Sequence, residues 1–494
     1  MKNRYIKYYL SIILASIFTT GFAQTEEDAL RYSNLQFGGT ARYLGVSGAF
    51  GALGADISVL SVNPAGMARY KKSEFTFTPN ISLSNTESRF NSSSMIAGKE
   101  NLNVGSFGIV GVTKQNPEKQ SKWNSIQFGF AYNRLADFNE SFQINGNNQN
   151  NYNSMSHVFA LRSLGSSPES LLQNDPFYGD LAYQTYITDY DSTTGLYSSR
   201  MNSQSIHHDH VVNRKGRVGE YSIAISGNYN QKFYIGGSVG IPKVHFEETK
   251  SHSEVEIADS TEFTHSFTFN EYNFTRGNGI NAKIGCIILP TQWLRLGLAY
   301  HTRTFYNLTD NWNTSMNSRV SETETYSYSS FDGNYRYQLT TPSRLIGSAS
   351  LIIAKKALIS VDYSRINHST SRLSPDTYYG GNYEFNAENN AIDSNYKAVN
   401  NIQIGSEMKL GDFYMIRAGY AIFQNPYSDL NDNSFNRSSY SLGIGYRNKK
   451  YFFDLGARYS IWKENYYMYD PSIVANSEID KSLLNVSFTI GFKW

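Results

Sequence analysis

Several features common in other protein classes are nearly absent from this chain of 494 residues. It contains one cysteine, Cys286, which excludes a disulfide framework and is typical of a small apolar side chain in a packed position. Beyond the first 23 residues no run of about 18 apolar residues occurs, which excludes transmembrane helices. The formal net charge is only +2, so the charge balance indicates neither nucleic acid nor an acidic polymer as a partner.

The chain also lacks the signs of several domains. A length of 494 residues would ordinarily predict about three domains, yet no Pro- or Ser-rich linker and no abrupt change of charge divides it. Aromatic residues are in excess, with 38 Tyr and 30 Phe, while only 17% of the residues are charged. Aromatic residues favour strands and gather at the two membrane–water interfaces of a transmembrane barrel. One large closed sheet therefore fits the composition better than three domains.

The N-terminus has the three parts of a secretory signal peptide. Basic residues at Lys2, Arg4 and Lys7 precede an apolar stretch, and a small-residue pattern ends at Ala23. The apolar stretch is too short to span a bilayer. We therefore expect residues 1–23 to be removed on export to the outer membrane.

The C-terminal segment has the clearest period-two pattern of the chain. Apolar residues from Leu484 to Trp494 occupy every second position, and the positions between them are mostly polar. Such alternation predicts a strand whose apolar face meets lipid and whose polar face lines a lumen. The terminal aromatic residues Phe492 and Trp494 resemble the signal by which barrels are recognised by the outer-membrane assembly machinery. We therefore expect this machinery and outer-membrane lipid as partners.

The same alternation recurs upstream in paired segments with short polar turns between them. Examples are Asn401–Leu410 with Phe413–Phe423, and Tyr440–Arg447 with Tyr451–Trp462. About fourteen strands are predicted, so the fold class is all-β: an antiparallel transmembrane outer-membrane β-barrel with long extracellular loops. An even number of strands places both barrel ends on the periplasmic side. The connections expected outside are 86–103, 138–217, 250–278, 307–341, 367–398, 424–436 and 464–480.

Two segments do not follow the barrel pattern. Residues 24–70 are rich in Gly and Ala without sustained alternation, which predicts an N-terminal hatch, or plug, before a barrel at 71–494. The connection 138–217 carries helical signals, including Ser167-Pro168-Glu169 as N-cap, first-turn proline and acidic first turn. Long loops of this kind are usually functional. Its apolar helical positions either form a ligand-capture groove or pack the loop onto the barrel rim: Val158, Phe159, Leu161, Leu164, Leu171 and Leu172.

The most specific motif lies just before the first predicted strand. A stretch of small residues from Gly45 ends at Asp56, and the turn Asn63-Pro64-Ala65-Gly66 follows it. Asn63 can bond to the backbone beyond it while Pro64 fixes φ, which makes a stiff turn able to plug a lumen. In these features the chain resembles the FadL/TodX family of outer-membrane transporters, most closely the forms of Bacteroidetes-type bacteria. The resemblance spans nearly the whole chain.

This resemblance implies a monomeric, 14-stranded barrel with a gating hatch, in which Asp56 and the residues 63–66 belong to the gate. It implies that a hydrophobic ligand is collected at the surface, passes through the lumen and leaves through a lateral gap in the wall. In the family this gap lies beside a kinked third strand. Here the third predicted strand is Trp123–Phe138, and its alternation through Phe130 and Tyr132 breaks at Asn133-Arg134. Either a bulge or the end of the strand above the membrane would cause such a break.

The cluster His207-His208-Asp209-His210 invites a metal or haem interpretation. Contiguous residues on an extended segment point alternately to opposite faces, so they cannot all surround one ion. We therefore expect a solvated loop here, with no metal and no cofactor. Neither a Gly-x-Ser-x-Gly elbow nor another catalytic set stands out, and we expect no enzyme.

The sequence therefore predicts a porin-like outer-membrane protein for passive uptake of hydrophobic small molecules, such as long-chain fatty acids or hydrocarbons. An apolar ligand gains free energy from each CH₂ group that is shielded from water, so it moves between apolar sites without an energy source. The alternative is a shuttle or binding component of a protein secretion pathway with the same fold. A receptor for haem or another ligand is a further alternative.

Overall fold

The structure is a computed structural model that describes residues 25–115, 121–148, 153–201, 205–257, 263–430 and 432–494. The predicted signal peptide, residues 1–23, lies outside the described residues. None of the described helices is long and apolar enough to cross a membrane.

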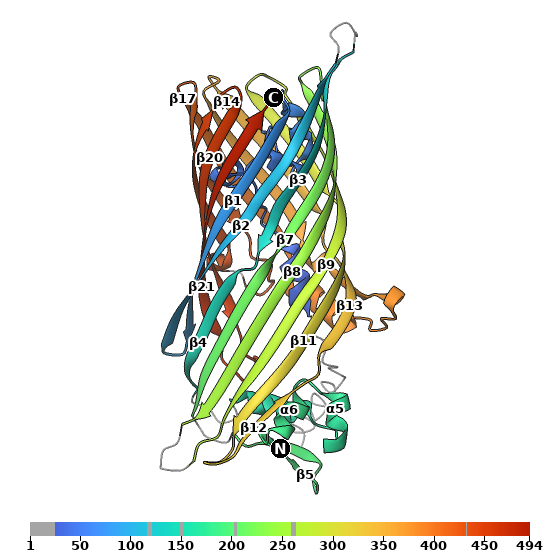
Figure 1. The fold of residues 1–494 in the computed structure, drawn as a ribbon, viewed down its shortest axis with the longest axis vertical. Coiled ribbons are helices and arrows are strands. Elements are labelled where there is room, and N and C mark those ends of the chain that lie inside the picture. The colour runs from blue at the N-terminus through green and yellow to red at the C-terminus, as the bar shows by residue number, and fades with distance from the viewer. Residues whose placement is uncertain (1–24, 116–120, 149–152, 202–204, 258–262, 431) are drawn as a thin grey trace, which may run out of the picture.

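The chain forms a closed antiparallel barrel of fourteen wall strands, as predicted (Figure 1). The first strand, β1 (Glu74–Phe90), pairs with the last, β21 (Ser477–Lys493), and this pairing closes the barrel. Four wall strands consist of two pieces each. Between β1 and β21 the wall runs through β2 (Ser93–Lys114), β3 (Trp123–Asp137) with β4 (Glu140–Asn148), β7 (Ile206–Tyr229), β8 (Phe233–Glu256), β9 (Ser266–Ile288), β10 (Leu294–His301) with β11 (Phe305–Arg319), β14 (Arg344–Ile353) with β13 (Gly333–Thr340), β15 (Ala357–Asn367) with β16 (Arg372–Pro375), β17 (Ala398–Leu410), β18 (Tyr414–Phe423), β19 (Arg437–Arg447) and β20 (Tyr451–Tyr466).

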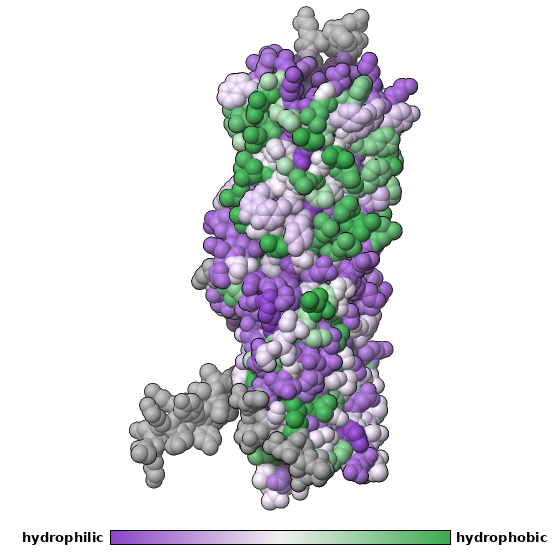
Figure 2. All heavy atoms as spheres, turned by 90° about the vertical axis from the view of Figure 1, so that its left-hand side faces the viewer, coloured by the Kyte–Doolittle hydropathy of each residue, from purple (hydrophilic) through white to green (hydrophobic). Residues whose placement is uncertain are grey.

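An apolar belt surrounds one half of the barrel. Figure 2 shows the belt as green in the upper half, whereas the lower half is mainly hydrophilic. Outward-facing aliphatic side chains such as Ile223, Leu442 and Ile490 are 65%, 68% and 43% exposed, which is expected of a surface that meets lipid. Exposed aromatic residues border the belt on both sides: Trp293, Phe413, Tyr414, Tyr451 and Trp494 near the short turns, and Tyr300, Tyr363, Tyr440 and Tyr459 on the opposite side. The chain is thus an outer-membrane β-barrel.

The wall continues far beyond this belt, and here the predicted strand ends were wrong. Strands β7 and β8 have 24 residues each, so much of the connections predicted at 138–217 and 250–278 is strand. The connection predicted at 86–103 is the end of the β1–β2 hairpin. Outside the membrane both faces of a strand meet water or polar neighbours, so the alternation ends although the strand does not.

The segment predicted as a hatch lies inside the half of the barrel that carries the belt (blue in Figure 1). Its elements are α2 (Glu26–Ser33), α3 (Ala41–Gly45), η1 (Ile57–Ser61) and η2 (Pro64–Arg69). From Thr40 to Ala68 nearly every residue is buried. The hatch therefore fills the lumen at membrane level.

A ring of glycines in the wall lets the hatch backbone touch the strands directly. A Cβ atom at Gly236 would lie 2.5 Å from the carbonyl oxygen of Pro64, and one at Gly419 would lie 2.5 Å from the carbonyl carbon of Val46. Neither backbone can shift cheaply to make room. Six wall glycines on six strands face the hatch backbone in this way, and a seventh, Gly285, faces the side chain of Asn63: the six are Gly236, Gly297, Gly405, Gly419, Gly443 and Gly456.

A cap of short elements covers the end of the barrel farthest from the belt (green in Figure 1). It consists of α4 (Met155–Arg162), η3 (Pro168–Ser170), α5 (Leu171–Asn174), α6 (Gly179–Gln184) and the hairpin of β5 (Thr188–Asp191) with β6 (Leu196–Ser199). The predicted start at Ser167-Pro168 is confirmed, because Ser167 is the N-cap of η3 and Pro168 follows it. The remaining elements lie in outer connections: β12 (Thr325–Ser329), η4 (His368–Thr370), η5 (Thr377–Tyr379), α7 (Asn386–Asn395) and η6 (Asn433–Phe435).

Candidate functional site

The hatch motif is held by hydrogen bonds between its own residues. Asp56 caps η1, because its Oδ1 accepts a hydrogen bond from the Ser58 N–H at 3.1 Å and both carboxylate oxygens accept from Thr40 Oγ1. Asn63 caps η2 by accepting from the Ala65 N–H at 3.1 Å, and its Nδ2 donates to the Gly51 carbonyl at 2.7 Å. The predicted stiff turn is therefore present and fully buried, with Pro64, Ala65 and Gly66 in it.

Polar side chains of the wall hold the hatch at several points. Asp362 Oδ2 accepts hydrogen bonds from the backbone N–H groups of Phe50 and Gly51 at 2.9 and 2.8 Å. On the other side of the lumen Glu220 accepts from Ser61 Oγ at 2.8 Å, and Lys283 pairs with the same carboxylate at 2.7 Å. These contacts and the glycine ring keep the lumen closed at this level.

Gly419→Leu is expected to disturb this closure. The added side chain meets the hatch backbone at Val46, and overpacking of this kind costs about 1–3 kcal/mol unless the hatch moves. We expect frequent open-channel events of this variant in planar bilayers, and little conductance of the wild-type protein. Gly347→Leu is the matched control, because a Cβ atom there meets no heavy atom within 4 Å. Equal conductance of the two variants would mean that the glycine ring does not hold the hatch closed.

A cavity of about 510 Å³ lies beside the hatch, between α2 and the wall strands β3, β20 and β21. Its volume is in the range of pockets that bind small molecules. Its lining combines apolar rings such as Phe138 and Trp462 with several charged side chains. Four of the lining residues belong to the edge of the wall near the end of β3: Gly105, Arg134, Ala136 and Asp137.

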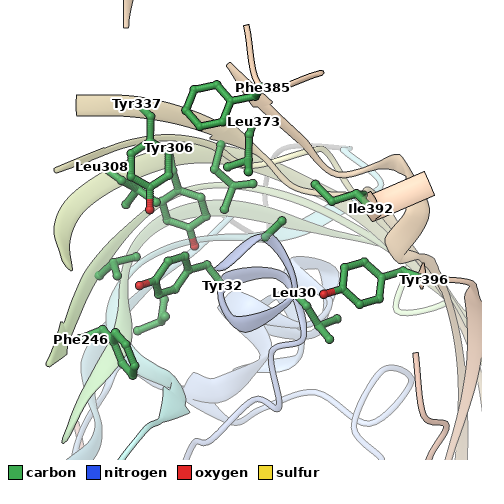
Figure 3. Close-up of a cluster of buried hydrophobic side chains, with 14 of the residues drawn as sticks. Leu30, Tyr32, Phe246, Tyr306, Leu308, Tyr337, Leu373, Phe385, Ile392 and Tyr396 are labelled. Carbon is green, nitrogen blue, oxygen red and sulfur yellow. The ribbon is translucent and has the colours of Figure 1, made fainter. Parts of the chain in front are cut away.

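Aromatic side chains fill the lumen on the far side of α2. Figure 3 shows Tyr32 of the hatch helix pointing toward Tyr306 and Tyr337 of the wall, with Phe385 beyond them. All four of these side chains are buried. Since this side of the lumen is packed, the open volume lies on the side of β3, β20 and β21.

Two arginines that line the cavity have no carboxylate partner among the described residues. Arg458 is only 5% exposed and forms no ion pair, and Arg437 stacks on Trp462 with its guanidinium carbon 4.1 Å from the ring centroid. The other cavity cations are paired, for example Lys481 with Glu140 at 3.0 Å. Buried charges are normally paired, so the two guanidinium groups offer a site for an anionic group.

On the cap side of the belt, Glu140 is the centre of a cluster of ion pairs. Burial alone raises the pKa of its carboxyl group, but Lys481 and Arg214 reverse this and bring the pKa below its ordinary value of 4.5. Its stabilising contribution is therefore complete above the unfolded-state pKa and is lost as the pH falls through the lower folded-state pKa. We expect the melting temperature of the wild type to fall below about pH 4.5 more steeply than that of Glu140→Gln. Parallel melting curves in detergent from neutral pH to acid would contradict this.

The barrel wall is not fully hydrogen-bonded between its second and third strands. Strand β2 pairs with β3 from Lys114↔Ser125 to Ser106↔Asn133. Beyond this point the described residues of β2, Ser93–Gly105, form no ladder with β3 or β4. The end of β3 and the whole of β4 pair only with β7. We call this place the wall gap. It begins at the edge of the belt, where the buried ring of Tyr132 stacks with the half-buried ring of Phe107.

The break predicted at Asn133-Arg134 is a β-bulge. The register of β3 with β7 shifts between Arg134 and Ala136, and Leu135 turns inward and is buried. The carbonyl of Arg134 accepts a hydrogen bond from the hatch, from the Gly38 N–H at 2.8 Å, so it is not available to β2. Of the two explanations left open by the sequence, the bulge is the correct one. Phe130 and Tyr132 lie before it, in the part of β3 that is paired with β2.

One side chain that the sequence did not indicate bridges the wall gap. Asp137 Oδ2 accepts hydrogen bonds from Asn101 and Asn103 of β2 at 3.3 and 3.5 Å, and from Ser82 of β1 at 3.0 Å. Its other oxygen lies 3.2 Å from Arg134 Nη2. Side chains thus replace the missing ladder, and such contacts can separate without unzipping a strand.

The predicted capture residues of the cap do not share one environment. Phe159 and Leu171 are fully buried, and Val158 is half-buried, so these positions pack the cap. Leu161, Leu164 and Leu172 are 58%, 44% and 51% exposed. Packing therefore accounts for the buried positions, and ligand capture by the three exposed leucines stays a prediction. At the other end of the barrel, Phe492 and Trp494 stack on the outer surface with ring centroids 5.8 Å apart.

The histidine cluster was predicted wrongly as a loop. His207-His208-Asp209-His210 lies in strand β7, which pairs on both sides. The alternation of faces was predicted correctly, since His208 and His210 are buried and point away from His207 and Asp209.

The fold and these features define a class: an outer-membrane β-barrel whose lumen is closed by an N-terminal hatch and whose wall is interrupted at the third strand. Solved structures share this fold. The toluene transporter TodX of Pseudomonas putida is 12% identical, with a TM-score of 0.53 over 92% of this chain and 98% of that one. A FadL homologue of Pseudomonas aeruginosa is 14% identical, with a TM-score of 0.55 over 92% and 98%. No family model and no curated protein matches the sequence.

Proposed function

We propose that this protein carries hydrophobic small molecules with an acidic head group, such as long-chain fatty acids, passively across the outer membrane. The observation that carries the proposal is the position of the cavity. It lies on a closed hatch, and Gly105, Arg134, Ala136 and Asp137 belong both to its lining and to the wall gap. A ligand in the cavity therefore has its shortest exit sideways, into the membrane.

The lining of the cavity suits an amphiphilic ligand, with an apolar chain and an acidic head group. Each CH₂ group that leaves water gains about 0.8 kcal/mol, so an apolar chain moves spontaneously from the cavity to the lipid. The unpaired guanidinium groups of Arg437 and Arg458 would bind the acidic head group during the passage. The exposed leucines of the cap, Leu161, Leu164 and Leu172, would collect the ligand at the surface.

The opening step of the proposed path is the release of Asp137. When its hydrogen bonds to Asn101 and Asn103 separate, the wall gap widens while the ladders of β2 with β1 and of β3 with β7 remain intact. The bond from Gly38 to the Arg134 carbonyl connects this event to the hatch. Asp56 and the turn 63–66 would keep the rest of the hatch in place.

Native mass spectrometry tests the proposal most directly. Protein extracted in mild detergent from its own outer membrane is measured intact, and the bound material is identified after organic extraction. A fatty acid or related amphiphile at one per chain supports the proposal. A stoichiometric protein partner without a lipid ligand would instead favour the secretion shuttle, and a bound haem would favour a receptor.

A further inference from the structure

A second buried cluster lies on the lumen side of β7 and β8, in the part of the barrel beyond the apolar belt. His208 and Glu254 are direct partners across these two strands, and His210 faces His252 one pair further along. The side chains of His208, His252 and Glu254 are at most 2% exposed. Each offers one ligand atom, and the three atoms lie within 4.8 Å of one another.

The separations of these atoms suit a metal ion. His208 Nδ1 is 3.3 Å from Glu254 Oε1, and His252 Nε2 is 2.9 Å from the same oxygen. In a tetrahedral zinc site with bonds of about 2.0–2.1 Å, neighbouring ligand atoms lie about 3.3 Å apart. Small side-chain rotations would therefore bring all three atoms to one ion.

The buried negative charge of Glu254 also favours a metal ion at this place. The Glu254 carboxylate is fully buried, and among the described residues its only ionisable partners within 4.0 Å are the two imidazoles. No lysine or arginine of that part of the chain neutralises it. Buried carboxylates are normally paired with a cation or coordinate a metal.

The hydrogen bonds around the cluster leave the Nε2 atom of His252 free to coordinate a metal ion. His252 Nδ1 is 3.2 Å from His210 Nδ1, and His210 Nε2 is 3.0 Å from the hydroxyl of Tyr466. If His252 donates through Nδ1 to His210, its Nε2 carries a lone pair toward Glu254. A ligating histidine usually donates its other ring N–H in this way. His208 is buried, and its one close polar contact among the described residues is that of Nδ1 with Glu254 Oε1, which does not have the geometry of a hydrogen bond.

We propose that His208, His252 and Glu254 form a zinc site that fastens the cap to the barrel wall. Nitrogen and carboxylate ligands in a tetrahedral arrangement favour zinc, and three protein ligands leave a fourth position for water or a small anion. Glu254 also accepts a hydrogen bond from the Met155 N–H at 2.8 Å and one from Ser154 Oγ, at the start of α4. A metal on this carboxylate joins β7, β8 and the first cap helix.

The histidines of one strand cannot surround an ion by themselves, but β8 supplies the missing ligands. The proposal departs from the expectation of no metal, because the register of β7 with β8 places Glu254 and His252 beside His208. The zinc site does not depend on the proposed transport function, and its test needs no transported ligand.

The first experiment uses the full-length protein in detergent after removal of metal with a chelator. Zinc is added and bound metal is measured, and cobalt(II) replaces zinc as a spectroscopic probe. We expect one zinc per chain, the visible absorption of tetrahedral cobalt, a higher melting temperature and slower proteolysis of residues 153–201. Absence of stoichiometric binding in the folded wild type would overturn the proposal.

Variants locate the ion. His208→Ala and Glu254→Gln are expected to lower zinc affinity at least about tenfold. Even the loss of a residue that only supports a metal ligand commonly has an effect of this size. His207→Ala is the matched control, because this neighbour on the same strand faces the other way and bonds to Asn145 and Asn147. An unchanged affinity in folded His208→Ala, or an equal loss in His207→Ala, would show that zinc binds elsewhere. If a variant fails to fold, the cobalt spectrum of the wild type still distinguishes the two possibilities. A tetrahedral site with nitrogen and oxygen ligands supports the proposal, and a loosely held surface ion contradicts it.

Discussion

Gly105→Trp is expected to reduce uptake of a labelled fatty acid such as oleate at least about tenfold, since the width of a passage decides what moves through it. Gly105 is the last residue of the part of β2 that does not pair with β3, and it lines the cavity. A Cβ atom at this position has its nearest neighbours at 3.4 Å, on Asn80 and Gly39, so the backbone accepts a side chain. An indole ring would then occupy the place where the cavity meets the wall gap.

Uptake by whole cells that produce the variant measures this effect. Gly105→Ala is the control, because its methyl group fits the same space without filling the passage. Both proteins must reach the outer membrane and show the usual shift in electrophoretic mobility on heating. If the tryptophan variant is folded and transports oleate at the wild-type rate, the ligand does not leave through the wall gap.

The double variant Arg437→Met, Arg458→Met is expected to lose affinity for oleate by a factor of about 30 to several thousand. Removal of one partner from a buried charge pair costs about 2–5 kcal/mol, and each 1.4 kcal/mol is a factor of ten. Neither arginine forms an ion pair within the described part of the chain, so the replacement should not expose an unpaired carboxylate there. The loss should therefore come from the ligand and not from the fold.

The ester methyl oleate separates charge from shape in this experiment. It has the same chain without the negative charge, and we expect the wild type and the double variant to bind it equally. Replacement of both arginines by lysine should restore part of the affinity for oleate, because charge returns without the planar guanidinium. Equal binding of oleate by wild type and the methionine variant in a fluorescence displacement assay would refute the assignment of these residues.

The strands of the barrel could be predicted from the sequence wherever the surroundings of a single strand impose an alternation of apolar and polar residues. Lipid on one side and a wet lumen on the other force alternation, so the strands around Tyr440–Arg447 and Tyr451–Trp462 were found at nearly their observed positions. The bulge at Leu135 was also readable, because an extra residue reverses the phase of the alternation. Beyond the belt the pattern ends, and the lengths of β7 and β8 could not be read from it.

Most of the site depends instead on contacts between distant segments. Asp137 is an ordinary acidic residue until the fold brings Asn101 and Asn103 to it. Arg437 and Arg458 become notable only when their lack of carboxylate partners is known. The hatch motif is an exception, because a cap and a proline act within a few residues of the chain and leave a local signature.

The glycine ring limits how the hatch can move. Glycines of seven wall strands touch the hatch around its perimeter. A movement of the whole hatch along the barrel axis would break all of these contacts at once, and it would press the hatch against wall residues that have side chains. A shift confined to the neighbourhood of Gly38 breaks one bond, the one to the Arg134 carbonyl. The open and closed forms should therefore differ in a small part of the hatch, and the bilayer stays sealed along the axis while a ligand leaves through the side.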